Sequence, residues 1–359
     1  MGKKQYIFVH GLSGWGSYDK VYRRMPYWGM RGGDLLSFLR SRGFDCYAAS
    51  VSPTGSAWDR ACELYAQLAG TVTDYGKYHS DLYKHERFGK DFRGQALIPD
   101  FHADTELVLL GHSFGGATIR LFAHLMKKGD EQERQAASSQ PLSPLFVGQS
   151  EKKILALITL AAPHNGTTAY DLFTDPSFDP RTVKSPFWSE AASRLMSLGT
   201  APKVDGRDPK DYAGFDMHID RADELNRIIG TDPQTYYFSV PCSATVRNDE
   251  GNFVPRRKKM EPLFVRRACQ IGAYSGESAG GIRLGDEWKE NDGLVNTISA
   301  MAPSHAPKTR FHRDRIRPGI WQVMHVYPGD HMALQGGLLY KQDIRKFYLR
   351  LLSVMDGLT

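Results

Sequence analysis

The feature of this sequence that most restricts its fold is a serine between glycines, placed directly after an apolar run. Residues 105–110 form that run, residues 111–116 read Gly-His-Ser-Phe-Gly-Gly, and a helical pattern follows at 117–128. The order of strand, G-x-S-x-G and helix is typical of a very tight turn that presents a nucleophilic serine. Glycines two residues to either side let the neighbouring chain approach without a Cβ clash. The pattern therefore predicts that Ser113 is a nucleophile, whereas the alternative is a glycine-rich turn with a passive serine.

The rest of the chain alternates strand and helix patterns in the way that builds a parallel sheet. The first expected strand, Tyr6–Val9, ends in the glycine-rich loop 10–16. The further strands are expected at 45–51, 105–110, 153–160, 236–240 and 323–327, and the helices at 34–41, 57–69, 117–128 and 342–355. This alternation predicts an α/β fold with a mostly parallel central sheet flanked by helices. We interpret residues 1–359 as a single domain.

Two segments depart from this alternation. Residues 74–98 are rich in tyrosine, histidine and charge, and we expect an irregular insertion there. Residues 169–215 hold several prolines and aspartates with interleaved apolar side chains, which predicts a cap or lid. The apolar residues of that cap are Phe173, Phe178, Phe187, Trp188 and Met196. They are expected to line a substrate groove, and an ordinary hydrophobic core is the alternative reading.

Charge and composition exclude several classes of protein. Lys+Arg is 46 and Asp+Glu is 40, so the net charge is +6, and we find no nucleic-acid-binding motif. The basic stretches 256–259 and 310–317 are therefore interpreted as solvated surface. The four cysteines show no C-x-x-C spacing, which argues against a disulfide framework. No apolar run approaches the roughly 18 residues of a membrane span, and the one after Met1 is too short for a signal peptide.

A nucleophilic serine also needs amide donors for the oxyanion that develops during acyl transfer. The N–H of Phe114 follows the serine, and the loop after the first strand offers the N–H of Leu12. A purely structural glycine-rich turn is the alternative for residues 10–12. A phosphate-binding loop is disfavoured because the Walker lysine and the G-x-G-x-x-G pattern are both missing.

The serine needs a histidine base that is itself oriented by a carboxylate, in the chain order serine, acid, histidine. His331 is favoured as the base because it follows the expected strand 323–327 on a loop, whereas His325 lies inside that strand. Asp292 is favoured as the acid because a turn signal and an apolar run surround it. The remaining alternatives for the acid are Asp286, Asp314 and Asp330.

The chain resembles the bacterial lipases of the staphylococcal and thermophilic Bacillus/Geobacillus group, together with their clostridial relatives. The shared stretches are residues 10–16, 58–63, 74–76, 87–89, 111–116, 162–168, 290–295, 330–331 and 347–351. The resemblance implies an α/β-hydrolase fold and a catalytic triad of Ser113, Asp292 and His331. It also implies a secreted enzyme whose signal peptide is absent from this chain.

The resemblance further implies a structural zinc site that ties the insertion and the cap to the core. The matching positions are Asp59, His79, His85 and Asp216. Two imidazoles and two carboxylates form a set that suits tetrahedral Zn²⁺. Without the resemblance, the two histidines read as surface residues. Calcium is not expected, because residues 332–339 hold no carboxylate where the thermophilic relatives carry theirs.

These observations predict a serine carboxylic ester hydrolase, namely a triacylglycerol lipase that acts on lipid or ester substrates at a lipid–water or polymer interface. The cap looks short, which keeps an open-site polyesterase or short-chain esterase as the alternative. A non-catalytic lipid-binding protein and a zinc hydrolase built on residues 59, 79, 85 and 216 are more remote readings.

Overall fold

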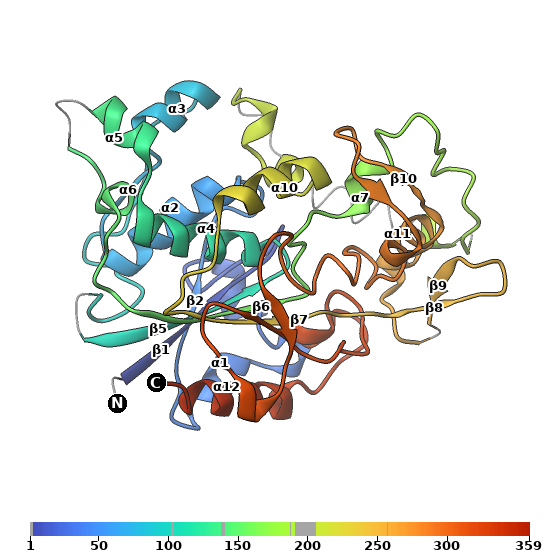
Figure 1. The fold of residues 1–359 in the computed structure, drawn as a ribbon. Coiled ribbons are helices and arrows are strands. Elements are labelled where there is room, and N and C mark those ends of the chain that lie inside the picture. The colour runs from blue at the N-terminus through green and yellow to red at the C-terminus, as the bar shows by residue number, and fades with distance from the viewer. Residues whose placement is uncertain (1–2, 102–103, 138–140, 187, 191–205, 257) are drawn as a thin grey trace.

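A seven-stranded parallel sheet forms the centre of the computed structural model (Figure 1). The structure describes residues 3–101, 104–137, 141–186, 188–190, 206–256 and 258–359. The strand order is β12-β13-β7-β6-β5-β1-β2. The bounds are Lys3–Val9 (β1), Asp45–Ala49 (β2), Thr105–His112 (β5), Ile154–Leu160 (β6), Tyr236–Val240 (β7), Lys308–Arg310 (β12) and Trp321–Val323 (β13). The predicted α/β fold with a parallel central sheet is confirmed.

Helices cover both faces of this sheet (Figure 1). On one face lie α2 (Ala57–Ala69), α4 (Gly115–Lys128) and α10 (Ile219–Ile228), and on the other lie α1 (Leu35–Arg40) and α12 (Arg345–Asp356). Successive side chains of a strand point to opposite faces, so Ile7 and Val9 of β1 pack toward α2 and α4, whereas Tyr6 and Phe8 pack toward α1 and α12. Strands buried on both faces explain the continuous apolar runs in the sequence.

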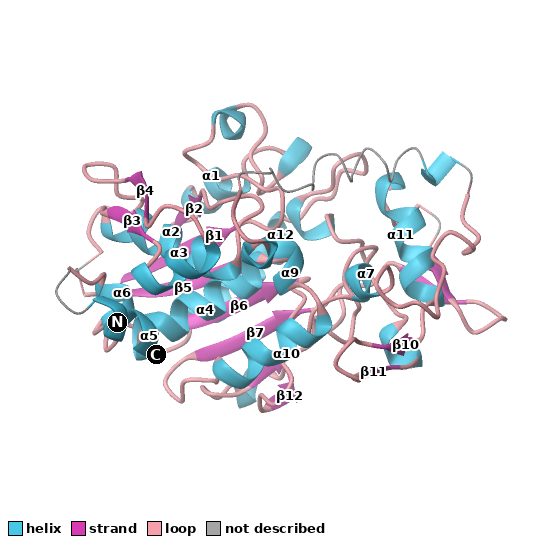
Figure 2. Cartoon of the chain, turned by 90° about the horizontal axis from the view of Figure 1, so that it is seen from above, coloured by secondary structure: helices cyan, strands magenta, loops and turns pink. Residues whose placement is uncertain are grey.

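Shorter elements surround this core (Figure 2). The additional helices are α3 (Lys77–Tyr83), α5 (Glu131–Ala137), α6 (Pro144–Val147), α7 (Thr168–Asp171), α9 (Ala213–Asp216) and α11 (Pro262–Ala273). Three small antiparallel ladders pair β3 (Val72–Asp74) with β4 (Phe88–Asp91), β8 (Thr245–Arg247) with β9 (Phe253–Pro255), and β10 (Gly276–Glu277) with β11 (Arg283–Leu284). The 3₁₀ turns are Lys20–Arg23, Met30–Gly32, Pro209–Asp211, Asp286–Trp288, Arg313–Arg315 and Ala333–Gln335.

The fold differs from the sequence predictions in two places. The late strand expected at 323–327 is β13, Trp321–Val323, so His325 lies beyond it and is exposed. The segment 74–98 holds α3 and β4 and is therefore more regular than expected. In the expected cap, Phe173 and Trp188 are exposed, whereas Phe178 packs edge-to-face on Tyr274. Residues 187 and 196, which also belong to that prediction, lie outside the described residues.

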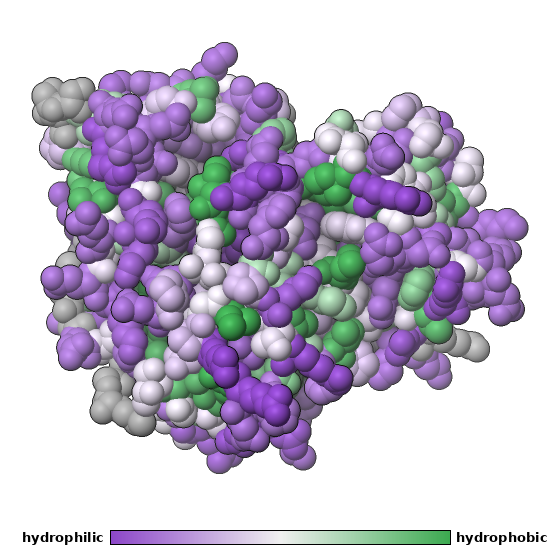
Figure 3. Space-filling model, in the orientation of Figure 1, coloured by the Kyte–Doolittle hydropathy of each residue, from purple (hydrophilic) through white to green (hydrophobic). Residues whose placement is uncertain are grey.

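The face shown in Figure 3 is mostly hydrophilic, and its hydrophobic side chains form separate patches. Within the described ranges, none of the helices has the length and apolar character needed to cross a bilayer.

Candidate active site

Ser113 occupies the tight turn between β5 and α4. Its φ is +54°, in the left-handed region that residues with a Cβ rarely adopt, and its backbone N–H donates to the Leu160 carbonyl at 2.9 Å. A Cβ on Gly111 would overlap the carbonyl of Gly115, and one on Gly115 would overlap the carbonyl of Val9. The glycines of the motif are therefore required by close backbone approach, which is the physical reason for the spacing seen in the sequence.

Three residues that are distant in sequence form one hydrogen-bonded row. His331 Nε2 lies 2.8 Å from Ser113 Oγ, and His331 Nδ1 lies 2.8 Å from Asp292 Oδ2. Asp292 Oδ1 accepts the backbone N–H groups of Leu294 at 3.0 Å and Val295 at 2.8 Å. A carboxylate has no proton to donate, so Asp292 Oδ2 accepts from Nδ1–H. This leaves Nε2 free to accept the serine proton. The serine, the aspartate and the histidine are all at most 6% exposed, so little water competes for these contacts.

The alternatives that the sequence left open lie elsewhere. Asp286 and Asp314 are on exposed turns, and the exposed His325 contacts Arg310. Asp330 is buried, and its carboxylate accepts backbone N–H groups, not an imidazole N–H. Burial raises the pKa of Asp330 to about 7.

A second row of hydrogen bonds fixes the backbone of His331. His112 Nε2 lies 2.9 Å from the His331 carbonyl, which can only accept, so the proton of His112 resides on Nε2. Tyr27 Oη then donates to His112 Nδ1 at 2.5 Å and accepts the Gly11 N–H at 3.1 Å. Burial, followed by the proximity of His331, lowers the pKa of His112 well below its usual value and keeps the imidazole neutral. Sequence reasoning missed Tyr27, because no spacing links it to the serine motif.

The two expected oxyanion donors lie on segments that meet at Ser113. A Cβ on Gly11 would lie 2.7 Å from Ser113 Cβ, so the loop after β1 touches the nucleophile. Neither the Leu12 N–H nor the Phe114 N–H donates to an acceptor in the described part of the chain. Both amides therefore remain available for a developing oxyanion.

Arg60 of α2 fixes the loop after β1 through hydrogen bonds to its carbonyl groups. Its buried guanidinium donates to the carbonyls of His10, Gly11 (3.4 Å) and Ser52 (3.2 Å). Its Nε donates to Thr118 at 2.9 Å. Burial lowers the pKa of Arg60 to about 10, so the cation persists at neutral pH. Sequence reasoning assigned no role to this residue, although it lies in one of the stretches that carried the resemblance.

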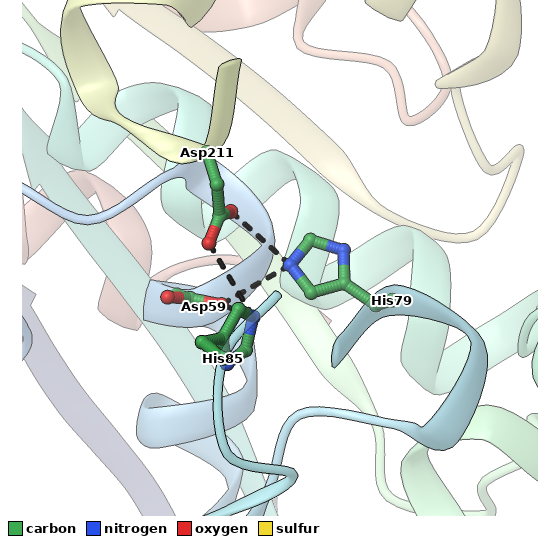
Figure 4. Close-up of side chains that lie close together, drawn as sticks. All are labelled: Asp59, His79, His85 and Asp211. Atoms are coloured by element: carbon green, nitrogen blue, oxygen red, sulfur yellow. Dashed lines mark hydrogen bonds and ion pairs between the residues drawn. The ribbon is translucent and has the colours of Figure 1, made fainter. Parts of the chain in front are cut away.

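A separate cluster of two carboxylates and two imidazoles lies between α2, α3 and the turn Pro209–Asp211 (Figure 4). Its members are Asp59, His79, His85 and Asp211, whose ligand atoms all lie within 4.8 Å of one another. His79 Nε2 lies 3.1 Å from Asp211 Oδ1 and 3.3 Å from Asp59 Oδ1. His85 Nε2 lies 3.4 Å from Asp211 Oδ2.

At the fourth position the structure corrects the sequence prediction, because Asp211 joins the cluster and Asp216 does not. Asp216 Oδ2 accepts the Ala57 N–H at 2.8 Å at the start of α2, and Oδ1 lies 3.4 Å from Arg221. This carboxylate therefore caps a helix. Burial raises the pKa of Asp216 to about 6. The two aspartates are five residues apart in the sequence, and only the 3₁₀ turn before α9 decides which one faces the histidines.

The cluster fits a divalent metal ion. Asp59 Oδ1 and His85 Nε2 are buried without a hydrogen-bond partner among the described residues, which is costly unless a further group satisfies them. His85 Nδ1 lies 2.9 Å from the Glu86 carbonyl, so its proton resides there and Nε2 presents a lone pair to the cluster. Two nitrogens and two carboxylate oxygens form a donor set typical of Zn²⁺.

Comparisons with known proteins identify the family of this chain. Residues 2–183 match the family model described as lipase-like, C-terminal domain. Lipase 2 of Staphylococcus aureus is 29% identical over 94% of this chain and 51% of its own length. Lipase 1 of S. aureus strain MRSA252 is 31% identical over 92% of this chain and 50% of its own length. The chain thus spans about half the length of the curated relatives it matches.

Solved structures are similar along the whole chain. The Staphylococcus hyicus lipase is 27% identical with a TM-score of 0.81, and the match covers 99% of this chain and 97% of that one. EstA from Clostridium botulinum is 28% identical with a TM-score of 0.84, covering 100% and 88%. Lipase 1 from Pelosinus fermentans is 28% identical with a TM-score of 0.79, covering 100% of both chains.

Proposed function

The chain belongs to the lipase-like family, and from this premise we propose that it is a serine carboxylic ester hydrolase of the triacylglycerol lipase type. The observation that carries the proposal is the row Ser113–His331–Asp292, with two contacts of 2.8 Å. Such a row is the recurring arrangement for acyl transfer through a covalent acyl-enzyme.

In the proposed mechanism, His331 Nε2 takes the proton of Ser113 as Oγ attacks the ester carbonyl. Asp292 holds the proton on Nδ1 and stabilises the imidazolium that forms. The N–H groups of Leu12 and Phe114 donate to the oxyanion. The imidazolium then protonates the leaving alcohol, and a water molecule deacylates Ser113 by the same route.

We also propose which kind of ester the enzyme hydrolyses. Long-chain triacylglycerols at a lipid–water interface are the first candidate, in keeping with the names of the relatives. The second candidate is a short-chain ester or polyester in an open site, which the exposure of Phe173 (54%) and Trp188 (45%) favours. Residues 169–215 are proposed as the cap over this site.

We also propose that the cluster of Asp59, His79, His85 and Asp211 holds a structural Zn²⁺. When bound, the ion would offset two buried carboxylates and join α2 to the segment 74–98. None of these four residues belongs to the serine site, which supports a structural role over metal-dependent hydrolysis. The resemblance to staphylococcal lipases also leads us to propose that the enzyme acts outside the cell.

Initial rates on p-nitrophenyl esters from acetate to palmitate, with Ser113→Ala as the blank, test the proposal. We expect serine-dependent hydrolysis, and the preferred chain length decides between the two substrate candidates. A peak at long chains supports the lipase, and a peak at acetate or butyrate supports the open-site esterase. Absence of serine-dependent turnover on every ester would refute hydrolysis and favour a lipid-binding role.

A further inference from the structure

The side chain of Glu261 accepts hydrogen bonds from the backbone of the segment that follows His331. The side chain is 1% exposed, and Oε1 accepts the backbone N–H groups of Leu338 at 2.7 Å, Leu339 at 2.6 Å and Tyr340 at 2.9 Å. Three amide donors on one charged oxygen form a set of charge-assisted hydrogen bonds, which are stronger than neutral ones. This carboxylate lies at the N-cap of α11 and is 77 to 79 residues away from its partners in the sequence.

The backbone of Glu261 is hydrogen-bonded to Asp330, the residue that precedes His331. Its N–H donates to Asp330 Oδ2 at 2.6 Å, and Asp330 Oδ1 accepts the Met332 N–H at 3.1 Å. Glu261 is therefore bonded to the residue before His331 and to the residues at the far end of the following loop. Both ends of the segment 330–340 are fixed to one point on α11.

The backbone conformation of the loop 332–340 brings its N–H groups to the Glu261 carboxylate. Gly336 and Gly337 have φ values of +104° and +73°, and a Cβ on Gly337 would overlap the Tyr340 carbonyl. These two glycines turn the chain back so that three successive N–H groups converge. Glu261 Oε2 is buried without a partner among the described residues, so Oε1 makes all three bonds. A buried carboxylate is costly unless such donors stabilise it, so loop and carboxylate depend on each other.

The first turn of α11 also contacts the imidazole directly. The Phe264 ring meets the His331 ring edge-to-face, with 6.2 Å between centroids and an interplanar angle of 85°. Anchoring the start of α11 to the histidine loop therefore fixes both the backbone of His331 and one wall of its ring.

We propose that Glu261 is a positioning residue for His331: its carboxylate and its N–H hold the loop so that Nε2 stays in line with Ser113 Oγ. The inference rests on the proposed function, in which His331 is the base. A base displaced by about 1 Å costs on the order of 100-fold in rate, so a loosened loop lowers turnover without weakening substrate binding.

The test compares Glu261→Ala, which removes the acceptor, with Glu261→Gln, which retains an oxygen at that position. On p-nitrophenyl butyrate we expect kcat of Glu261→Ala to fall about 30- to 100-fold with KM within threefold. Glu261→Gln should stay within about fivefold of wild type, because its amide oxygen can accept the same N–H groups. Leu155→Ala is the matched control, since Leu155 is fully buried at the amino end of β6. It should lower the Tm and leave kcat within about twofold.

A spectroscopic readout separates positioning from general loosening. The downfield NMR signal of the proton between His331 Nδ1 and Asp292 should persist in wild type, Glu261→Gln and Leu155→Ala, and broaden or vanish in Glu261→Ala. A folded Glu261→Ala with wild-type kcat and an intact signal would overturn the inference, as would equal impairment of Glu261→Gln.

If Glu261→Ala does not fold, Glu261→Asp carries the test, because the shorter side chain withdraws the oxygen from the loop. A kcat within threefold of wild type would then overturn the inference. The NMR signal reports on His331 even if no ester is hydrolysed. Loss of the proposed function and loss of the positioning role are therefore distinguishable.

Discussion

Gly11→Ala tests whether the loop after β1 is held against the nucleophile as closely as the structure indicates. The added methyl carbon would lie 2.7 Å from Ser113 Cβ, 3.1 Å from the His112 carbonyl and 3.2 Å from Ser113 Oγ. Ordinary carbon–carbon contact begins at about 3.4 Å, so the loop and the serine must separate by roughly 0.7 Å.

Either way of relieving this overlap damages the proposed reaction. If Ser113 moves, its distance to His331 Nε2 increases from 2.8 Å. If the loop moves, the Leu12 N–H leaves the position of the oxyanion, and loss of one such donor costs about 10²- to 10³-fold in kcat. We therefore expect kcat to fall about 100-fold, equivalent to about 2.7 kcal/mol in activation free energy, with little change in KM.

The assay is steady-state hydrolysis of p-nitrophenyl butyrate, with the Tm measured in parallel. Gly230→Ala is the matched control, because a Cβ at Gly230 meets no atom within 4 Å, and its kcat should stay within twofold. A folded Gly11→Ala enzyme with kcat within threefold of wild type would show that the loop does not approach Ser113 in this way, and the proposed role of Leu12 would be withdrawn.

Four further predictions rest on the contacts described above. Asp211→Asn should weaken Zn²⁺ binding at least tenfold and Asp216→Asn less than threefold in competition with a chromogenic chelator; equal effects would return the ligand role to Asp216. Chelation should lower the Tm before it lowers kcat at 25 °C, and immediate loss of kcat would argue for a catalytic metal. Burial, then the charge of a neighbouring carboxylate, raises the pKa of Glu63 to about 7, so its contribution to stability is full below about pH 4.5 and is lost as the pH rises through 7. Glu63→Gln should therefore be more stable than wild type by about 3 kcal/mol at pH 8 in urea unfolding, and should show no such gain at pH 4.5. A pH-independent difference would contradict this. Tyr27→Phe leaves His112 Nδ1 and one backbone N–H without a partner and should cost about 2–4 kcal/mol of unfolding free energy; a loss below 0.5 kcal/mol would contradict the inferred network.

The central sheet and the serine turn were predictable because their causes are local in sequence. Glycine spacing around Ser113 and apolar runs long enough for buried strands are both visible in a linear pattern. The start of α2 at Ala57 and of α4 at Gly115 agree with the expected helices to within two residues. The late strand was misplaced because residues 323–327 carry β-type side chains, whereas the ladder with β7 begins at Trp321 and ends at Val323.

The fourth member of the proposed metal cluster and the contacts that fix the His331 loop were not predictable, because they depend on contacts between distant segments. Asp211 and Asp216 have the same chemistry, and only the turn Pro209–Asp211 distinguishes them. Glu261 carries no motif, and its partners are backbone N–H groups, which leave no residue-type signal in the sequence. Tyr27 contributes a single hydroxyl from a loop whose position depends on tertiary packing.

The side chains of residues 58–63, one of the stretches that carried the resemblance, make contacts on two sides of α2. Trp58 stacks on His79 with ring centroids 5.1 Å apart, and Asp59 faces the same cluster. Arg60 points to the other side of α2 and holds the carbonyls of the loop after β1. Glu63, one turn later, accepts from the backbone at Ser52. Since successive helical residues diverge by about 100°, one turn of α2 contacts both the cluster that we propose holds zinc and the loop after β1. A substitution that rotates this turn should therefore disturb both sites together.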